Sequence, residues 1–187
     1  MSVEVCFETH STSVDNELGI ATGWNEGELS EAGRRQAVQL GDRRRHDRIA
    51  VVFTSDLRRA VQTAELAFAG SPLPIVRDSR LRECNYGELN GMPRTRLEAE
   101  RLLRIDEPFP GGESWRQAVD RVAGFLHELP RSHDGERVLV IGHVATRWAL
   151  DQVALGASLD TLAASPFEWR EGWEYTLHTR EGGTFEP

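Results

Sequence analysis

The 187-residue sequence contains no lysine, only two cysteines and no long apolar run. Every fixed cation is therefore an arginine, and the planar guanidinium of arginine suits phosphate or carboxylate groups. Cys6 and Cys84 form neither a metal-ligand spacing nor a disulfide framework, so we expect no metal, no cofactor and no disulfide. The N-terminus has no basic segment leading into an apolar run, and no stretch is long enough to cross a bilayer. We therefore expect no signal peptide, no membrane span and a cytoplasmic location.

The charge of the chain restricts its partners. A formal net charge of -8 argues against nucleic acid or an anionic membrane as the main partner. An anionic substrate must instead be held in a locally positive pocket. The length predicts one domain over residues 1–187, large enough for a sizeable core. A homodimer is expected only because it is the commonest soluble assembly.

Strand and helix patterns alternate along the chain. Apolar segments at 3–9, 49–55 and 137–143 predict buried strands, and 172–179 predicts an edge strand. Helical patterns follow at 31–46 behind a Ser30 cap, and at 56–68, 113–129 and 145–156. This alternation predicts an α/β layered fold with a mainly parallel sheet.

Three predicted strands end in polar residues that suit an anion site. The first ends at His10, the second at Ser55 with Arg59 shortly after it, and the third at His143. Because sites form at the carboxyl ends of parallel strands, these residues are expected around one crevice. The amino ends of the following helices add N–H donors and positive potential.

Five segments, in order, resemble the histidine phosphatase superfamily, the clan that includes cofactor-dependent phosphoglycerate mutases. "SDLRRAVQTAELAF" is similar to its S-x-L-x-R-A-x-Q-T-A segment, and "LRECNYGELNG" to the segment with its acid/base glutamate. "PFPGGES", "VLVIGH" and "TGWNEGELSEAG" resemble further family segments. Together they cover roughly residues 3–150. The resemblance implies a three-layer α/β/α sandwich like that of phosphoglycerate mutase.

The first family motif, R-H-G-[ET], reads Thr9-His10-Ser11-Thr12 in this sequence. The histidine is kept and Thr12 fits the fourth position, whereas Thr9 and Ser11 depart from the motif. Asn16 stands where the family often has asparagine, and Val144 replaces the glycine that usually follows the second histidine. These departures all fall in the expected active centre.

The resemblance implies a role for each central residue. His10 would attack a phosphomonoester and form a phosphohistidine, which water then hydrolyses. Arg59 would clamp the phosphoryl oxygens, and His143 would donate to one of them. Glu83 would protonate the leaving oxygen and then activate water. Substrate contacts are expected from six further residues: Thr9, Ser11, Asn16, Thr22, Gly23 and Arg147.

Several neighbours of these residues are expected to have plainer roles. Arg58 cannot face the pocket from the same helix as Arg59, so we expect it on the surface. Arg82 is expected in an ion pair, and Cys84 as a small buried residue, because no base partner for a thiol is identifiable.

Thr9 is uncharged where the family motif has an arginine, and two hypotheses account for this difference. Arg147, one turn into the last predicted helix, is either a substitute cation or a surface residue. Alternatively, the substrate group carries less negative charge than a phosphomonoester dianion.

The leading functional prediction is a phosphatase that acts on a small phosphorylated metabolite. A mutase is the first alternative, but the short stretch from Glu83 to "PGGES" leaves little room for a lid. A phosphoryl-binding module with reduced or lost catalysis is the second alternative. Specificity is expected to depend on residues 92–109, with Arg94, Arg96 and the nearby Trp115 as candidate contacts.

Overall fold

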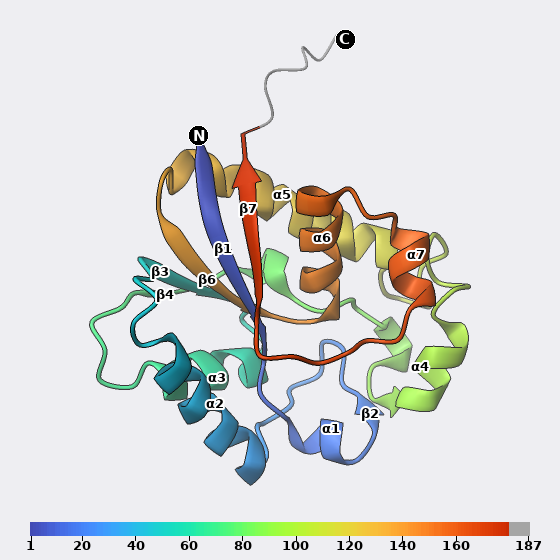
Figure 1. Ribbon diagram of the computed structural model, residues 1–187. Helices are drawn as coiled ribbons and strands as arrows, with labels where there is room; N and C mark the ends of the chain where they lie inside the picture. Colours follow the sequence, from blue (N-terminus) through green and yellow to red (C-terminus); the bar gives the residue numbers. More distant parts are fainter. Residues whose placement is uncertain (180–187) are drawn as a thin grey trace, which may run out of the picture.

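The computed structural model describes residues 1–179 (Figure 1). Its elements in chain order are β1 (Ser2–Thr9), α1 (Val14–Glu17), β2 (Ile20–Ala21), α2 (Glu31–Arg44), β3 (Val51–Thr54), α3 (Arg58–Ala67), β4 (Ile75–Arg77), the 3-10 turns η1 (Ser79–Leu81) and η2 (Gly87–Leu89), β5 (Met92–Pro93), α4 (Arg94–Glu100), α5 (Trp115–Ser132), β6 (Arg137–Gly142), α6 (Val144–Leu155), α7 (Leu159–Ala164) and β7 (Trp173–His178).

The main sheet has five strands in the order β4-β3-β6-β1-β7. All neighbours are parallel except β1 and β7, which are antiparallel, so the predicted edge strand is confirmed. Figure 1 shows α2 and α3 on one face of the sheet, with α5 and α6 on the other. The predicted three-layer sandwich with a mainly parallel sheet is confirmed.

The pleat of β1 divides its side chains between the two layers. Val3, Val5 and Phe7 pack in the larger core cluster with α5 and α6. Cys6 points to the opposite face and packs with residues of α2 and α3, such as Leu40 and Ala64. The strands β3 and β6 are buried on both faces, which explains their continuous apolar sequence.

The main helices begin at caps that their sequences supply. The Ser30 hydroxyl accepts the Gly33 N–H and starts α2, as predicted. Ser114 and Gln117 form a reciprocal capping box at the start of α5. The helices α2 and α5 therefore begin within two residues of the positions that the sequence predicts.

A small lobe lies at the end of the molecule where β1, β3 and β6 finish (Figure 1). It consists of α1, α4 and a two-stranded antiparallel pair, β2 and β5. The Arg94 N–H donates to the Gly19 carbonyl over 2.8 Å and ties α4 to this lobe. The alternating pattern did not predict this lobe, because each of its elements is too short to show a period. Within residues 1–179, no helix is long and apolar enough to span a membrane.

Candidate active site

The strand order brings the predicted strand ends together, since β3, β6 and β1 are adjacent. The His10 N–H donates to the Gly142 carbonyl over 3.0 Å, which extends the β1–β6 pairing into the site. The rings of His10 and His143 lie with their centroids 5.0 Å apart. Two imidazoles from neighbouring strands therefore face one small space at the carboxyl edge of the sheet.

The hydrogen bonds of His10 define which ring nitrogen is free. Its Nδ1 lies 2.8 Å from the Ser11 carbonyl, which can only accept, so Nδ1 carries the proton. The Arg59 Nε donates to the His10 Nε2 over 3.3 Å, so Nε2 presents a lone pair. Burial, helped by the charge of Arg59, lowers the pKa of His10 to about 3. The imidazole is therefore neutral near pH 7, as a nitrogen nucleophile requires.

Arg59 lies in the first turn of α3 and is almost completely buried, with 2% of its surface exposed. Its Nη2 donates to the Gly23 carbonyl over 2.9 Å, and its backbone carbonyl accepts the Thr63 hydroxyl over 2.8 Å. The remaining nitrogen, Nη1, is buried without a hydrogen-bond partner in the described residues. A buried charged donor without an acceptor is costly, so this atom suits an anionic ligand.

His143 is the cap residue of α6 and is also buried. Its Nε2 lies 2.7 Å from the Ser55 Oγ at the end of β3, and its Nδ1 lies 3.5 Å from the Arg59 Nη2. Burial holds the pKa of His143 well below its usual range, and the charge of Arg59 acts in the same direction. His143 is therefore a neutral ring whose Nδ1 faces the cation.

Glu83 is a buried carboxylate whose charge acts on Arg59. Its Oε1 accepts the N–H groups of Cys84 at 2.9 Å and Ala145 at 3.1 Å, while its Oε2 accepts Val144 at 3.2 Å. The anion that occupies the amino end of α6 is thus a side chain of the protein itself. Burial raises the pKa of Glu83 despite these hydrogen bonds and the charge of Arg59, which favours a carboxyl that exchanges protons.

The loop before Glu83 is held by Arg121 of α5. Arg121 donates to the carbonyls of Arg80 at 2.8 Å, Arg82 at 3.1 Å and Glu83 at 3.2 Å. Trp24 also donates from its Nε1 to the Glu83 carbonyl over 2.6 Å. The acid residue is therefore fixed on both its backbone and its side chain.

The hydroxyl residues Thr9 and Ser11 flank His10 in the chain but supply no charge. Thr9 ends β1 opposite Gly142 and is half-buried, and Ser11 is buried with its N–H bound to the Thr63 Oγ1 at 3.0 Å. Within residues 1–179, neither side-chain hydroxyl has a protein hydrogen-bond partner. The structure thus leaves both hydroxyls available near the nucleophile.

The structure brings Gly23 to this centre but engages two other predicted contacts elsewhere. The Asn16 Oδ1 accepts the Ser13 N–H over 3.0 Å, in the capping box of the exposed helix α1. The Thr22 hydroxyl donates to the Asp15 Oδ2 over 2.8 Å. Gly23 contributes its carbonyl to Arg59, and its positive φ of 57° together with its contact to Tyr86 excludes a side chain there.

Arg147 is not brought to the histidines. Its Nε donates to the Asp151 Oδ1 over 3.0 Å, and its guanidinium lies 4.6 Å from the Trp173 ring centroid. Tyr175 donates to the same carboxylate over 2.7 Å. The i,i+4 spacing of Arg147 and Asp151 is the sequence signal that indicates this pairing.

The structure shows the surroundings of Arg58, Arg82 and Cys84, the three neighbours for which plainer roles were expected. Arg58 is half exposed and pairs with Glu28 at 2.7 Å, as a surface residue should. Arg82 forms the expected ion pair, with Asp56. Cys84 is fully buried, and burial raises the pKa of its thiol. The predicted strand end already included Ser55, but nothing in its sequence context indicates that it bonds His143.

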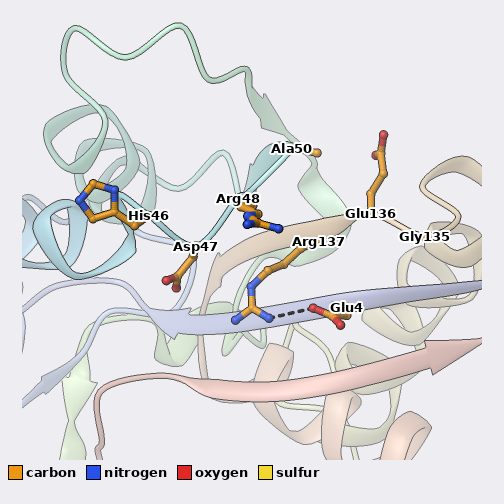
Figure 2. Close-up of a pocket in the computed structure, with 8 residues that line it drawn as sticks. All are labelled: Glu4, His46, Asp47, Arg48, Ala50, Gly135, Glu136 and Arg137. Atoms are coloured by element: carbon orange, nitrogen blue, oxygen red, sulfur yellow. Dashed lines mark hydrogen bonds and ion pairs between the residues drawn. The ribbon is translucent and has the colours of Figure 1, made fainter.

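A separate open pocket of about 450 Å³ lies at the opposite, amino edge of the sheet (Figure 2). Its lining residues are Glu4, His46, Asp47, Arg48, Ala50, Gly135, Glu136 and Arg137. Arg137 pairs there with Glu4 at 2.9 Å, and the lining charges are of both signs. This pocket contains none of the predicted site residues. Within residues 1–179, no group of three or more His, Cys, Asp or Glu side chains is placed to hold a metal ion.

Known proteins resemble this chain in sequence and in fold. The family model described as "Histidine phosphatase superfamily (branch 1)" matches residues 6–183. A 2,3-bisphosphoglycerate-dependent phosphoglycerate mutase from Methylobacterium sp. (strain 4-46) is 36% identical over 168 residues, which cover 82% of this chain and 81% of the relative. Phosphoserine phosphatase 1 from Hydrogenobacter thermophilus is 28% identical, covering 84% of this chain and 78% of the relative. The solved structure of Bacillus stearothermophilus YhfR superposes with a TM-score of 0.80 at 26% identity, covering 98% of this chain and 94% of that structure.

Proposed function

Because the chain belongs to branch 1 of the histidine phosphatase superfamily and is therefore a phosphoryl-transfer enzyme, we propose that it hydrolyses small phosphomonoesters through a phosphohistidine on His10. One observation carries the proposal. The unprotonated Nε2 of His10 accepts from the Arg59 Nε, and the buried Nη1 of the same guanidinium has no acceptor among residues 1–179. A nucleophile and a cation with an unsatisfied donor are therefore in direct contact.

The first chemical step transfers the phosphoryl group to the enzyme. The His10 Nε2 lone pair attacks phosphorus in line while the bond from phosphorus to the leaving oxygen breaks. Arg59 Nη1 neutralises the phosphoryl oxygens. The protonated carboxyl of Glu83 gives its proton to the leaving oxygen, so the product departs as an alcohol.

His143 donates to a phosphoryl oxygen during this step. The Ser55 hydroxyl can rotate and donate to the His143 Nε2, which leaves the ring proton on Nδ1. The His143 Nδ1 is 3.5 Å from the Arg59 Nη2. A phosphoryl oxygen placed between these two nitrogens receives a hydrogen bond from each. Such donors act most strongly when charge develops in the transition state.

The second step regenerates the enzyme. The Glu83 carboxylate takes a proton from water as the water oxygen attacks phosphorus, and the bond to His10 Nε2 breaks. Inorganic phosphate leaves, and Glu83 is again protonated. The raised pKa of Glu83 suits a group that must both give and accept a proton.

Phosphate release from p-nitrophenyl phosphate tests this proposal, with His10→Ala as the matched variant. We expect release by the parent protein, an acid-labile phosphoenzyme after rapid quenching, and neither for His10→Ala. Equal rates for the parent and the variant would end the hydrolase proposal. They would favour a phosphoryl-binding module instead.

Mutase activity is the second candidate, and the 36% identity to a phosphoglycerate mutase favours it. Incubation with 3-phosphoglycerate, in the presence of 2,3-bisphosphoglycerate, separates the two activities. A phosphatase releases inorganic phosphate, whereas a mutase produces 2-phosphoglycerate. The short segment from Glu83 to Ser114 leaves little protein to shield a phosphoenzyme from water, which favours hydrolysis.

A further inference from the structure

Four arginines that adjoin the site residues, in the chain or by contact, are already neutralised. They form ion pairs with carboxylates of the protein: Arg58 with Glu28 at 2.7 Å, Arg82 with Asp56 at 2.5 Å, Arg121 with Glu113 at 2.8 Å and Arg147 with Asp151 at 2.9 Å. Arg59 differs from them, because it forms no ion pair within residues 1–179 and its Nη1 is buried there without a hydrogen-bond partner. Of these five arginines, Arg59 alone offers an entering anion an uncompensated positive charge.

The other groups of the site supply hydrogen bonds but no positive charge. Burial lowers the pKa of His10 to about 3 and holds that of His143 well below its usual range, so both rings are neutral near pH 7. Glu83 is uncharged when protonated, and when ionised it adds a negative charge. Its carboxyl also occupies two N–H groups at the amino end of α6. One arginine, two neutral rings and a protonated carboxyl leave the site with a single positive charge.

The remaining titratable groups that act on Arg59 bring no further cation. Asp15 of α1 accepts the Thr22 hydroxyl over 2.8 Å and has no ion pair within the described residues, so its negative charge acts on Arg59. Burial raises the pKa of Tyr86 well above its usual range, which keeps this hydroxyl neutral. The formal net charge of -8 on the whole chain acts in the same direction as Asp15. A second negative charge on a ligand would therefore meet carboxylates rather than another cation.

We propose that the site binds the singly charged form of a phosphomonoester, in which one phosphoryl oxygen carries a proton, in preference to the dianion. The inference rests on the proposed function, because it assumes that the phosphoryl group lies between His10 and Arg59. One negative charge balances Arg59, whereas a dianion leaves one buried charge without a partner. The bound phosphoryl group therefore keeps its second proton to a higher pH than it does in water.

The two residues that flank His10 suit a phosphoryl group that carries a proton. The P–O–H group is a donor and needs an acceptor, which a guanidinium cannot provide. Thr9 and Ser11 have hydroxyls without a protein hydrogen-bond partner in the described part of the chain, and a hydroxyl accepts as well as donates. Their side chains therefore match a singly charged group better than a fully ionised one.

Two ligands of the same shape and different charge test the proposal. Phenyl sulfate is singly charged at pH 5 and at pH 7.5, whereas phenyl phosphate loses its second proton with a pKa of about 6. The dissociation constants of both are measured by calorimetry at these two pH values on the His10→Asn protein, which cannot form a phosphohistidine. Phenyl sulfate reports any change in the protein itself, so the ratio of the two affinities isolates the charge of the ligand.

We expect the two ligands to bind about equally at pH 5. At pH 7.5 phenyl phosphate should bind about 30-fold more weakly than phenyl sulfate, since only about 3% of it is still singly charged. Thr9→Arg should remove most of this loss by adding a second cation. Thr176→Arg adds the same charge at an exposed position of β7 and should preserve the loss.

Three results would overturn the proposal: an affinity ratio that is the same at both pH values, tighter binding of phenyl phosphate at pH 7.5 than at pH 5, or no binding of either ligand. Equal losses in the Thr9→Arg and Thr176→Arg proteins would overturn its explanation by charge. The parent protein allows the same comparison with benzylphosphonate and benzylsulfonate, whose bonds from carbon to phosphorus and sulfur are not hydrolysed. The test therefore does not depend on the folding of the His10→Asn protein.

The charge preference and the hydrolase proposal can fail separately. If the preference is present but the parent releases no phosphate from p-nitrophenyl phosphate, only the hydrolase proposal fails. If phosphate is released without any preference for the singly charged ligand, only the charge proposal fails. The charge of the ligand acts on binding and so on kcat/KM, whereas kcat at saturating substrate still reports the ionisation of Glu83.

Discussion

The Nε of Arg59 donates to the Nε2 of His10 over 3.3 Å, so the cation of α3 and the ring at the end of β1 are oriented by each other. This contact directs the Nε2 lone pair of His10 toward a guanidinium whose Nη1 has no acceptor within residues 1–179. Because the bond is long, an entering phosphoryl group can replace it without losing a strong interaction.

Arg59→Lys should lower kcat/KM for a simple phosphomonoester by about 100-fold or more. An ammonium cannot bind the Gly23 carbonyl and a phosphoryl group with the fork geometry of a guanidinium, and each lost hydrogen bond to a charged group costs about 1.5–3 kcal/mol. The adjacent Arg58→Lys is the control, because Arg58 is half exposed and paired with Glu28. Similar losses in both variants would contradict the role of Arg59.

Glu83→Gln should lower kcat by about 10²–10⁴-fold and remove the alkaline limb of the pH–rate profile. The raised pKa of Glu83 keeps its proton to higher pH than an ordinary carboxyl, and activity in the parent falls as that proton is lost. Because the pKa of His10 is about 3, the nucleophile stays neutral over the acid range above it. The activity of the parent should therefore decline on the alkaline side of the profile, as Glu83 loses its proton. The exposed Glu88→Gln variant should keep the parent profile, and an unchanged alkaline limb in Glu83→Gln would exclude Glu83 as the acid.

The buried His10 should make stability depend on pH. Its folded pKa of about 3 lies below the unfolded value of roughly 6.5, so below that value the unfolded chain binds a proton that the folded chain does not. The free energy of unfolding should therefore fall as pH decreases from 7 toward 3. For His10→Asn, the loss between pH 7 and pH 5 should be smaller than in the parent by about 1–2 kcal/mol. Urea titrations at pH 7 and pH 5 measure this loss of unfolding free energy, and the exposed His46→Asn variant is the control. Identical losses in the His10 variant and the parent would be incompatible with this linkage.

Thr9→Arg should raise kcat/KM for simple monoesters by about tenfold, since it adds a charged donor at the family position next to His10. Thr9 ends β1 and is only half-buried, so a longer side chain has a route to solvent. Initial rates on p-nitrophenyl phosphate provide the measurement. A lower rate in a folded variant would count against a missing clamp as the reason for any low activity.

Arg147→Ala should change stability rather than catalysis. It removes the ionic partner of Asp151, which is only 4% exposed, although the Tyr175 hydroxyl remains bound to the carboxylate. We expect a loss of about 1–3 kcal/mol in the free energy of unfolding, with kcat/KM within a few fold of the parent. A selective fall in activity without destabilisation would instead support Arg147 as the substitute cation.

The sequence indicates the candidate site where its residues lie at strand ends, and it gives no signal for contacts that depend on irregular segments. His10 and His143 follow apolar strands, and the parallel order of those strands was enough to bring them together. The small lobe of α1, α4, β2 and β5 carried no such signal, because each of its elements is too short to show a period. Asn16 and Thr22 were predicted as substrate contacts by motif position. Their side chains also cap or brace their own loop, and these contacts depend on local geometry that motif position does not indicate.

The carboxylate of Glu83 also closes the first turn of the helix that carries His143. When the leaving group takes its proton, the ionised carboxylate binds the Val144 and Ala145 N–H groups more strongly than the neutral acid did. The amino end of α6 should therefore be most rigid while the phosphohistidine exists and loosen again as water discharges it. Backbone amide exchange at these two residues would then follow the covalent state of the enzyme, although neither residue has any part in the chemistry.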